Sequence, residues 1–321
     1  QLAVVDSLAC HACVALAGHV GKNRWMPSEA STPLPSLQVR HVLVPLDGSE
    51  FALQAMPTAR ALAERFGAEL QTISVAGAGD DVRRLRAFAS AALDVDDGNH
   101  RALVVAGGDA ADEIVRRAGE LGSCVVCLST RGRGRLHGAL VGSVARSVLQ
   151  RSPEGVVALG PMADNPGWSP RPRSWPEPLS VPRLVACVDG SDTSEEILPL
   201  SVAWARALGM SLTILTIIED QPPPARLQSQ SRYGPDSDAD AYIAQLVQRW
   251  RRTSSDVDGA AVRDPIGLAS GIRAHLSERP AGLVTMTTHA RSGLQRVMLG
   301  AAAANIVHAS VAPCLVVPVR S

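Results

Sequence analysis

Aromatic side chains, lysine and long apolar segments are scarce in this chain of 321 residues. Phe, Tyr and Trp together make up 3% of the sequence, whereas 46% of the residues are hydrophobic. The cores must therefore be built from Ala, Val, Leu and Ile, which is typical of buried parallel sheets. Lys22 is the only lysine and the formal net charge is zero, which argues against a basic surface for nucleic acid.

No segment reaches the length of a transmembrane span. Residues 2–20 are apolar, but Asp6, His11 and His19 interrupt them and no positive region precedes them. This pattern argues against a secretory signal. We therefore expect a cytoplasmic protein without a membrane partner.

Six cysteines raise the question of a metal site, because Cys10/Cys13 and Cys124/Cys127 both have the Cys-x-x-Cys spacing. Zinc-binding pairs usually lie on turns, whereas Cys124 and Cys127 fall inside a short apolar segment typical of a buried strand. We therefore expect reduced thiols and no bound metal.

Short apolar segments alternate with segments of helical spacing along the first half of the chain. Strands are expected at residues 41–49 (ending in a polar turn), 69–75, 101–105, 124–128 and 155–160, with helices at 50–66, 80–93, 110–120 and 144–151. Ser49 is expected to cap the first helix, and Gly67 to end it in the left-handed conformation. This alternation predicts a doubly wound α/β domain.

The same pattern restarts at Leu184. Asp189 and Gly209 repeat Asp47 and Gly67 at a distance of 142 residues, and Gly300 repeats Gly142 at a distance of 158. The increase indicates an insertion in the second copy, for which the polar segment 221–235 is the obvious place. The chain is therefore an internal duplication of one domain.

A proline-rich segment separates the two copies and reads as an extended linker. We expect a tail at residues 1–38, a first domain at 39–161, the linker at 162–182 and a second domain at 183–320. The expected fold class is α/β, with two tandem doubly wound (Rossmann-like) five-stranded parallel-sheet domains.

A glycine-rich loop runs from Ser129 to Ser143, between an apolar strand and a helix. Free amides at a helix N-terminus, together with the helix dipole, bind anions. Gly132 and Gly142 let the backbone approach a ligand closely, and Ser143 is expected to add a hydroxyl donor at the N-cap. An ordinary connection between a strand and a helix remains the alternative.

The spacing of this loop resembles the nucleotide-binding motif of the universal stress protein family, Gly-x-x-Gly, nine residues, then Gly-Ser or Gly-Thr. Gly132, residues 133–141 and Gly142-Ser143 match this motif, whereas Ser129 stands where the family has its first glycine. The resemblance covers residues 41–161 and 183–319.

The resemblance implies ATP, with magnesium, as the ligand. It implies that Asp47, with Pro45 beside it, contacts the adenosine and that Val75 meets the adenine through its backbone. The ribose and phosphates would be held by Gly132, Gly142, Ser143 and Val144. A turn or cap residue is the alternative for Asp47.

Ser129 leaves two alternatives open. If the family glycine requires a positive φ, serine costs about 1 kcal/mol at this position. If the glycine only gives room, the hydroxymethyl group either crowds the ribose or donates to it. The charges of Arg131, Arg133 and Arg135 likewise pair with the triphosphate or stay solvated.

Other nucleotide and catalytic motifs are absent from the sequence: no lysine-containing phosphate loop, no dinucleotide fingerprint, no serine elbow and no His-Glu-x-x-His. No general base stands out near the loop, so catalysis faster than a slow ATPase is not expected. The first hypothesis is an ATP-binding protein of stress response or signalling. The alternatives are a slow ATPase or phosphoryl-transfer enzyme, and an interaction module that binds no nucleotide.

Members of the family pair through their last strands, and this chain has two such segments, 155–160 and 315–319. We expect them to meet within one chain; whether two chains then form a homodimer stays open. The two domains are expected to be unequal. The second domain keeps Asp189 and Gly300, but other positions of its motif have changed and now hold Cys187, Thr287, Ala290 and Ala301.

Overall fold

The computed structural model describes residues 34–93, 100–131, 141–152, 155–163, 179–219, 238–288 and 301–318. The elements of the first half are β1 His41–Pro45, α1 Glu50–Leu53, α2 Met56–Phe66, β2 Glu69–Ala76, α3 Val82–Leu93, β3 His100–Ala106, α4 Ala110–Leu121, β4 Cys124–Ser129, α5 Ser143–Arg151 and β5 Val156–Leu159. Those of the second half are β6 Arg183–Cys187, α6 Asp192–Glu195, α7 Ile197–Leu208, β7 Ser211–Glu219, α9 Ala239–Arg251, β8 Val257–Asp264, α10 Leu268–Glu278, β9 Leu283–Thr287, α11 Ala301–Ala309 and β10 Cys314–Val317.

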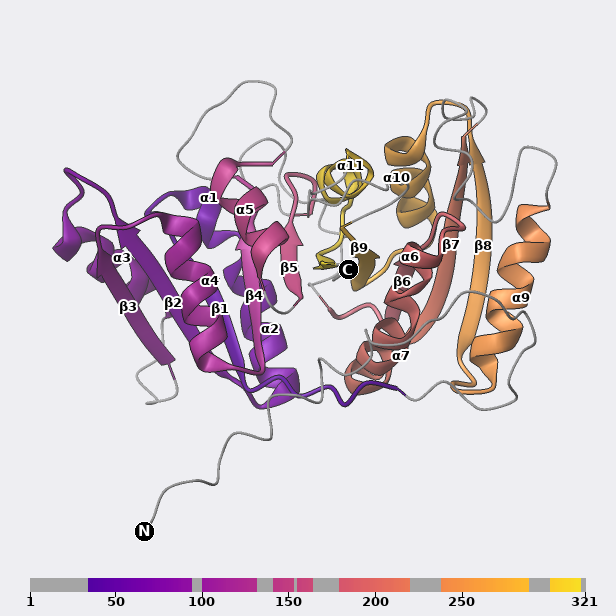
Figure 1. Cartoon of the computed structure of the whole chain (residues 1–321), viewed down its shortest axis with the longest axis horizontal. Helices are drawn as coiled ribbons and strands as arrows, with labels where there is room; N and C mark the ends of the chain where they lie inside the picture. The colour runs from indigo at the N-terminus through magenta and orange to yellow at the C-terminus, as the bar shows by residue number, and fades with distance from the viewer. Residues whose placement is uncertain are drawn as a thin grey trace, which may run out of the picture.

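The strands form one ten-stranded sheet in the order β3-β2-β1-β4-β5-β10-β9-β6-β7-β8 (Figure 1). Within each half the five strands run parallel to one another. Read inward from either edge of the sheet, both halves have the same topology, and the winding direction reverses beside the first strand of each. The predicted fold class of two tandem doubly wound α/β domains is therefore confirmed.

Helices cover both faces of the sheet, and each face buries an apolar core. One core contains side chains of α2, α3, α7 and α9, and the other contains side chains of α4, α5, α10 and α11. Aliphatic residues dominate both cores, with Trp204, Tyr242 and Trp250 as aromatic exceptions among the buried side chains. No helix in the described ranges combines the length and the apolar character needed to span a bilayer.

The first helical segment of each half is interrupted at the same place. Ser49 caps α1 and Gly67 ends α2 at φ 62°, both as predicted. The predicted continuous helix over 50–66 is wrong, because α1 ends at Leu53 and α2 begins at Met56. Pro57 has no N–H to donate to the carbonyl of residue 53, and its ring crowds that carbonyl. Pro199 repeats this feature, and α6 is likewise separated from α7.

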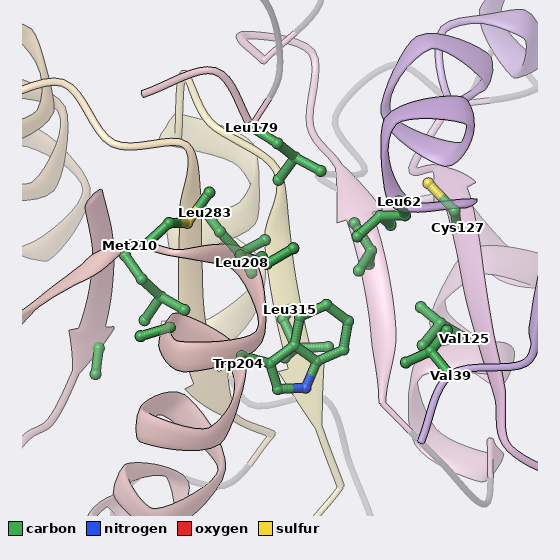
Figure 2. Close-up of a cluster of buried hydrophobic side chains, with 14 of the residues drawn as sticks. Val39, Leu62, Val125, Cys127, Leu179, Trp204, Leu208, Met210, Leu283 and Leu315 are labelled. Carbon is green, nitrogen blue, oxygen red and sulfur yellow. The ribbon is translucent and has the colours of Figure 1, made fainter. Parts of the chain in front are cut away.

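The last strands of the two halves lie side by side. β5 and β10 pair in antiparallel register, with Val157 opposite Leu315, and this ladder joins the two five-stranded sheets. Side chains of both halves also share one apolar core at this junction. Figure 2 shows Leu315 beside Trp204, with Leu62 and Val125 of the first half across from them.

Candidate functional site

Three of the predicted site residues lie where neighbouring strands end. The register between β1 and β2 puts Asp47 level with Val75, and the register between β1 and β4 puts it level with the residue after Ser129. The winding direction reverses between β1 and β4. Ligands of open α/β sheets bind beyond the carboxyl ends of the strands at such a point.

The backbone of Val75 points toward the space beyond the end of β1. The amide of Leu46 donates to the carbonyl of Ile73 (2.8 Å), which is the last bond between β1 and β2. The carbonyl of Ala76 faces β3, because it accepts from the amide of Gly107 (2.9 Å). Successive residues of a strand alternate in direction, so the N–H and C=O of Val75 face the space beyond the end of β1.

Pro45 lies where β1 and β4 separate. Because the Leu46 amide faces β2, an amide at position 45 would face β4. The ladder between β1 and β4 ends at Leu43, however, so the missing N–H of Pro45 removes no hydrogen bond from the sheet. Pro45 thus fits the end of pairing at the switch point.

Asp47 shapes the turn that follows β1. Its Oδ1 accepts from the backbone N–H of Ser49 (2.9 Å) and from the Ser49 hydroxyl (2.6 Å). Gly48 supplies the positive φ of 81° that this turn needs. The turn role, which the sequence left as an alternative, is therefore present, and the half-buried Asp47 lies just beyond the end of β1.

Thr130 holds together the two ends of the glycine-rich loop. Its backbone N–H (2.9 Å) and its hydroxyl (3.1 Å) both donate to the carbonyl of Leu159 on β5, and its own carbonyl accepts from the amide of Gly142 (2.9 Å). The sequence analysis missed this residue. Thr288 lies 158 residues later, and its backbone N–H likewise donates to the carbonyl of Val317 (3.0 Å). The recurrence of this threonine in the second copy was the sequence signal that could have identified Thr130.

Gly142 and Ser143 form the start of α5, and here the prediction needs a correction. Ser143 is not the N-cap, because it is the first residue of the helix and Gly142 is the cap. A Cβ on Gly142 would lie 3.2 Å from the Thr130 carbonyl oxygen, which is a tight contact, so the glycine suits this cap. No side chain of the described residues caps the first turn, which leaves its N–H groups facing outward. Ser143 and Val144 are exposed beside them.

Ser129 is not strained. Among the described residues only Ser123 and Leu179 combine a side chain with a positive φ, so the alternative of a positive φ at Ser129 is wrong. Its hydroxyl instead accepts from the backbone N–H of Arg131 (3.3 Å) at the entrance of the loop. The remaining predicted residue, Gly132, lies outside the described residues, as do Arg133 and Arg135.

The second domain repeats the turn after the first strand but not the sequence at the start of α5. Asp189 Oδ1 accepts from the Ser191 N–H (3.0 Å) and hydroxyl (2.6 Å), much as Asp47 does with Ser49. α11 begins at Ala301, so this helix lacks the hydroxyl that Ser143 gives α5. Ala290 and Gly300 fall outside the described residues.

The cysteines of β4 do not form a joint binding site. Side chains three residues apart on a strand point to opposite faces, and Cys124 and Cys127 belong to different cores. Burial raises the pKa of the Cys127 thiol far above its usual range. Within the described parts of the chain, no group of three or more His, Cys, Asp or Glu side chains is placed to hold a metal ion.

Comparisons with known proteins agree with the duplicated fold. The sequence model of the universal stress protein family matches residues 38–159 and 181–318. The crystal structure of a universal stress protein from Archaeoglobus fulgidus covers 87% of this chain and 98% of its own at a TM-score of 0.59 and 18% identity. A putative universal stress protein from Pseudomonas aeruginosa covers 87% and 93% at a TM-score of 0.56 and 14% identity. The comparison with curated proteins gives no match.

Proposed function

The chain belongs to the universal stress protein family, and from this premise we propose that its first domain binds ATP at the crevice between β1 and β4. Membership supports a role in the stress response. In this proposal the bound nucleotide acts as a signal that the protein reads, rather than as a substrate that it turns over.

The observation that carries the proposal is the start of α5 beside the strand ends, whose first turn no side chain of the described residues caps. The outward N–H groups of its first turn carry the positive end of the helix dipole. Gly142 keeps the approach to them free of side-chain atoms, and Thr130 fixes the loop that leads there. A triphosphate fits such a site because it offers several anionic oxygens to donors that have no acceptor within the helix.

The other predicted residues would hold the rest of the nucleotide. The N–H and C=O of Val75 would pair with the adenine, and Asp47 would accept a hydrogen bond from the adenosine. Gly132, Gly142, Ser143 and Val144 would surround the ribose and phosphates, and Ser129 would lie next to the ribose. A magnesium ion would offset part of the phosphate charge.

We also propose that one chain acts as a pseudo-dimer, with domains at residues 39–161 and 183–320. The support is the ladder between β5 and β10, which occupies the edge strands that separate domains would leave open. A further homodimer would have to use another surface. The buried free thiols Cys127, Cys187 and Cys314 favour a reducing compartment, so we place the protein in the cytoplasm.

Calorimetric titration of the purified chain with Mg-ATP tests the proposal, together with mass spectrometry of any nucleotide that copurifies. Gly142→Val should abolish binding, because its side chain would fill the approach to the α5 amides. Gly119→Ala on α4 is the matched control, since a Cβ there meets no atom within 4 Å. Unchanged affinity in Gly142→Val would mean that the site is misplaced.

Two other outcomes separate the alternative functions. Steady release of phosphate from bound ATP would identify a slow ATPase. A parent chain that neither carries nor binds a nucleotide, and whose thermal midpoint Mg-ATP leaves unchanged, would identify an interaction module, because any ligand of the native state raises that midpoint.

A further inference from the structure

His275 is a buried titratable residue that the nucleotide site does not use. It lies on α10, where its side chain packs with 6% exposure, and its Nε2 has no hydrogen-bond partner among the described residues. A buried imidazole in this position is favoured in its neutral form, because the charged form would lose its hydration without gaining an acceptor.

Four charged groups act electrostatically on this ring. Glu278 is the last residue of α10 and Arg279 is its C-cap, whereas Asp258 belongs to β8 and Arg183 to β6. Burial is the main cause that lowers the pKa of His275, and the two arginines lower it further against the opposing effect of the two carboxylates.

One oxygen of Asp258 is already engaged. Arg279 Nη2 lies 2.6 Å from Asp258 Oδ2, and Arg183 Nη1 donates to the carbonyl of Pro280 (3.2 Å). Burial works against ionisation of Asp258, but the hydrogen bond from Arg279 and the positive charges of Arg279 and Arg183 outweigh it and lower its pKa. The ion pair thus ties Arg279, the C-cap of α10, to β8, and the backbone N–H of Arg279 donates to the carbonyl of His275 (2.8 Å) one turn earlier.

The first domain solves the same position differently. Arg117 lies 158 residues before His275 and donates to the side-chain oxygen of Gln71 (2.8 Å). Thr213 replaces Gln71 in the second domain, 142 residues later. The first domain therefore has a permanent cation, Arg117, whose acceptor is the Gln71 amide. The second domain has the titratable ring of His275 at the same position, and its Nε2 has no acceptor among the described residues.

We propose that His275 makes the second domain acid-responsive: its protonation places a third cation between Arg183 and Arg279 and releases α10 from the sheet. Ile272 and Leu276 of α10 share a core with Val307 of α11. The backbone of Val307 in turn lies against Gly160, at the end of β5 in the first domain. Release of α10 would therefore expose apolar surface next to the junction of the two domains.

The direction of the pH effect follows from linkage. The folded-state pKa of His275 lies below that of the unfolded chain, so the unfolded state binds the proton first as the pH falls. The stability that neutral His275 preserves is complete above the ordinary histidine pKa of about 6.5 and decreases as the pH falls below it. Between the unfolded-state and folded-state pKa values, the unfolding equilibrium constant rises about tenfold for each unit by which the pH falls.

Urea unfolding of the full chain between pH 8 and pH 4.5 tests the proposal. His275→Gln keeps a neutral polar side chain and should remove the rise in the unfolding constant below pH 6.5. Arg117→Gln in the first domain is the matched control and should leave that rise in place. Hydrogen exchange, corrected for the intrinsic pH effect, should locate the acid-induced opening of the parent at residues 268–278.

Parallel pH profiles for the parent and His275→Gln would overturn the proposal. If His275→Gln does not fold, NMR titration of the parent's histidine rings decides instead. A ring assigned to His275 that titrates at or above the ordinary histidine pKa in the native protein excludes the mechanism, and one that titrates below it supports the mechanism.

Discussion

The ring of Phe66 meets the ring of Trp204 edge to face, with centroids 5.2 Å apart and an angle of 76° between the planes. Phe66 ends α2 in the first domain, and Trp204 lies on α7 in the second. Arg65, the neighbour of Phe66, also donates to the carbonyl of Leu208 at the end of α7 (3.2 Å). The two domains are therefore joined by a helix contact as well as by the ladder between β5 and β10.

A double-mutant cycle should detect this contact between domains. Phe66→Leu and Trp204→Leu each install the residue that the other repeat has at that place, Leu208 and Leu62 respectively. The coupling energy from urea unfolding should be about 0.5–1.5 kcal/mol, because aromatic pairs contribute this much beyond their buried area. Phe88→Leu on α3 combined with Trp204→Leu serves as the control. Free energies that add within about 0.5 kcal/mol for Phe66 and Trp204 would show that the rings are not coupled.

Gly160 marks a close backbone approach between the domains. A Cβ at this position would lie 1.8 Å from the carbonyl oxygen of Val307, so Gly160→Ala must push α11 away from the end of β5. We expect a loss of about 1–3 kcal/mol in the free energy of unfolding. Gly119→Ala, with no atom within 4 Å of its Cβ, should instead stabilise the chain by about 0.5–1 kcal/mol. Equal effects of the two changes would contradict the close contact.

Local signals in the sequence were sufficient for the elements and for the repeat. Ser49, Gly67 and Gly209 act on their own helices, and their effects need no distant partner. The duplication made the order of the strands predictable from one copy to the next. Pro57 also carried a local signal, which was overlooked when a continuous helix was predicted.

Other features depend on contacts between segments that are distant in the sequence. The small cap at Gly142 suits the tight contact with the Thr130 carbonyl, and the contact of Phe66 with Trp204 exists only because the two domains meet. The φ of Ser129 follows from its place at the end of a strand, which the family motif alone does not reveal. The position of the nucleotide motif was thus predictable, whereas its capping geometry was not.

The four cysteines in the described parts of the chain should be unreactive in the native protein. Burial raises the pKa of Cys314 to about 12, and it raises those of Cys127 and Cys187 further. Alkylation at pH 8 followed by peptide mass spectrometry should modify these thiols, and Cys124, only after unfolding in urea. Labelling of Cys127 under native conditions at the rate of a free thiol would contradict its buried position on β4.

The matched turns of the two domains allow a direct test of which domain binds ATP. Asp47→Ala and Asp189→Ala each remove two hydrogen bonds of nearly equal length to the following serine, so their structural costs should be similar. Their effects on binding should differ. Equilibrium dialysis at tens of micromolar ATP should give about one nucleotide per chain, which Asp47→Ala largely removes and Asp189→Ala leaves in place.

The first residues of α5 and α11 explain why the two domains are expected to differ in ATP binding, and exchanging them provides a second test. The hydroxyl of Ser143 would donate to a charged phosphate, and such a bond is worth about 1.5–3 kcal/mol, or about 10- to 100-fold in affinity. Ser143→Ala should weaken binding in the first domain by that factor. Ala301→Ser, which restores the hydroxyl at the first residue of α11, should strengthen any binding in the second domain in the same direction. Two nucleotides per chain in the parent would show that the two domains bind equally well. A loss of binding caused by Asp189→Ala alone would show that the second domain is the stronger site.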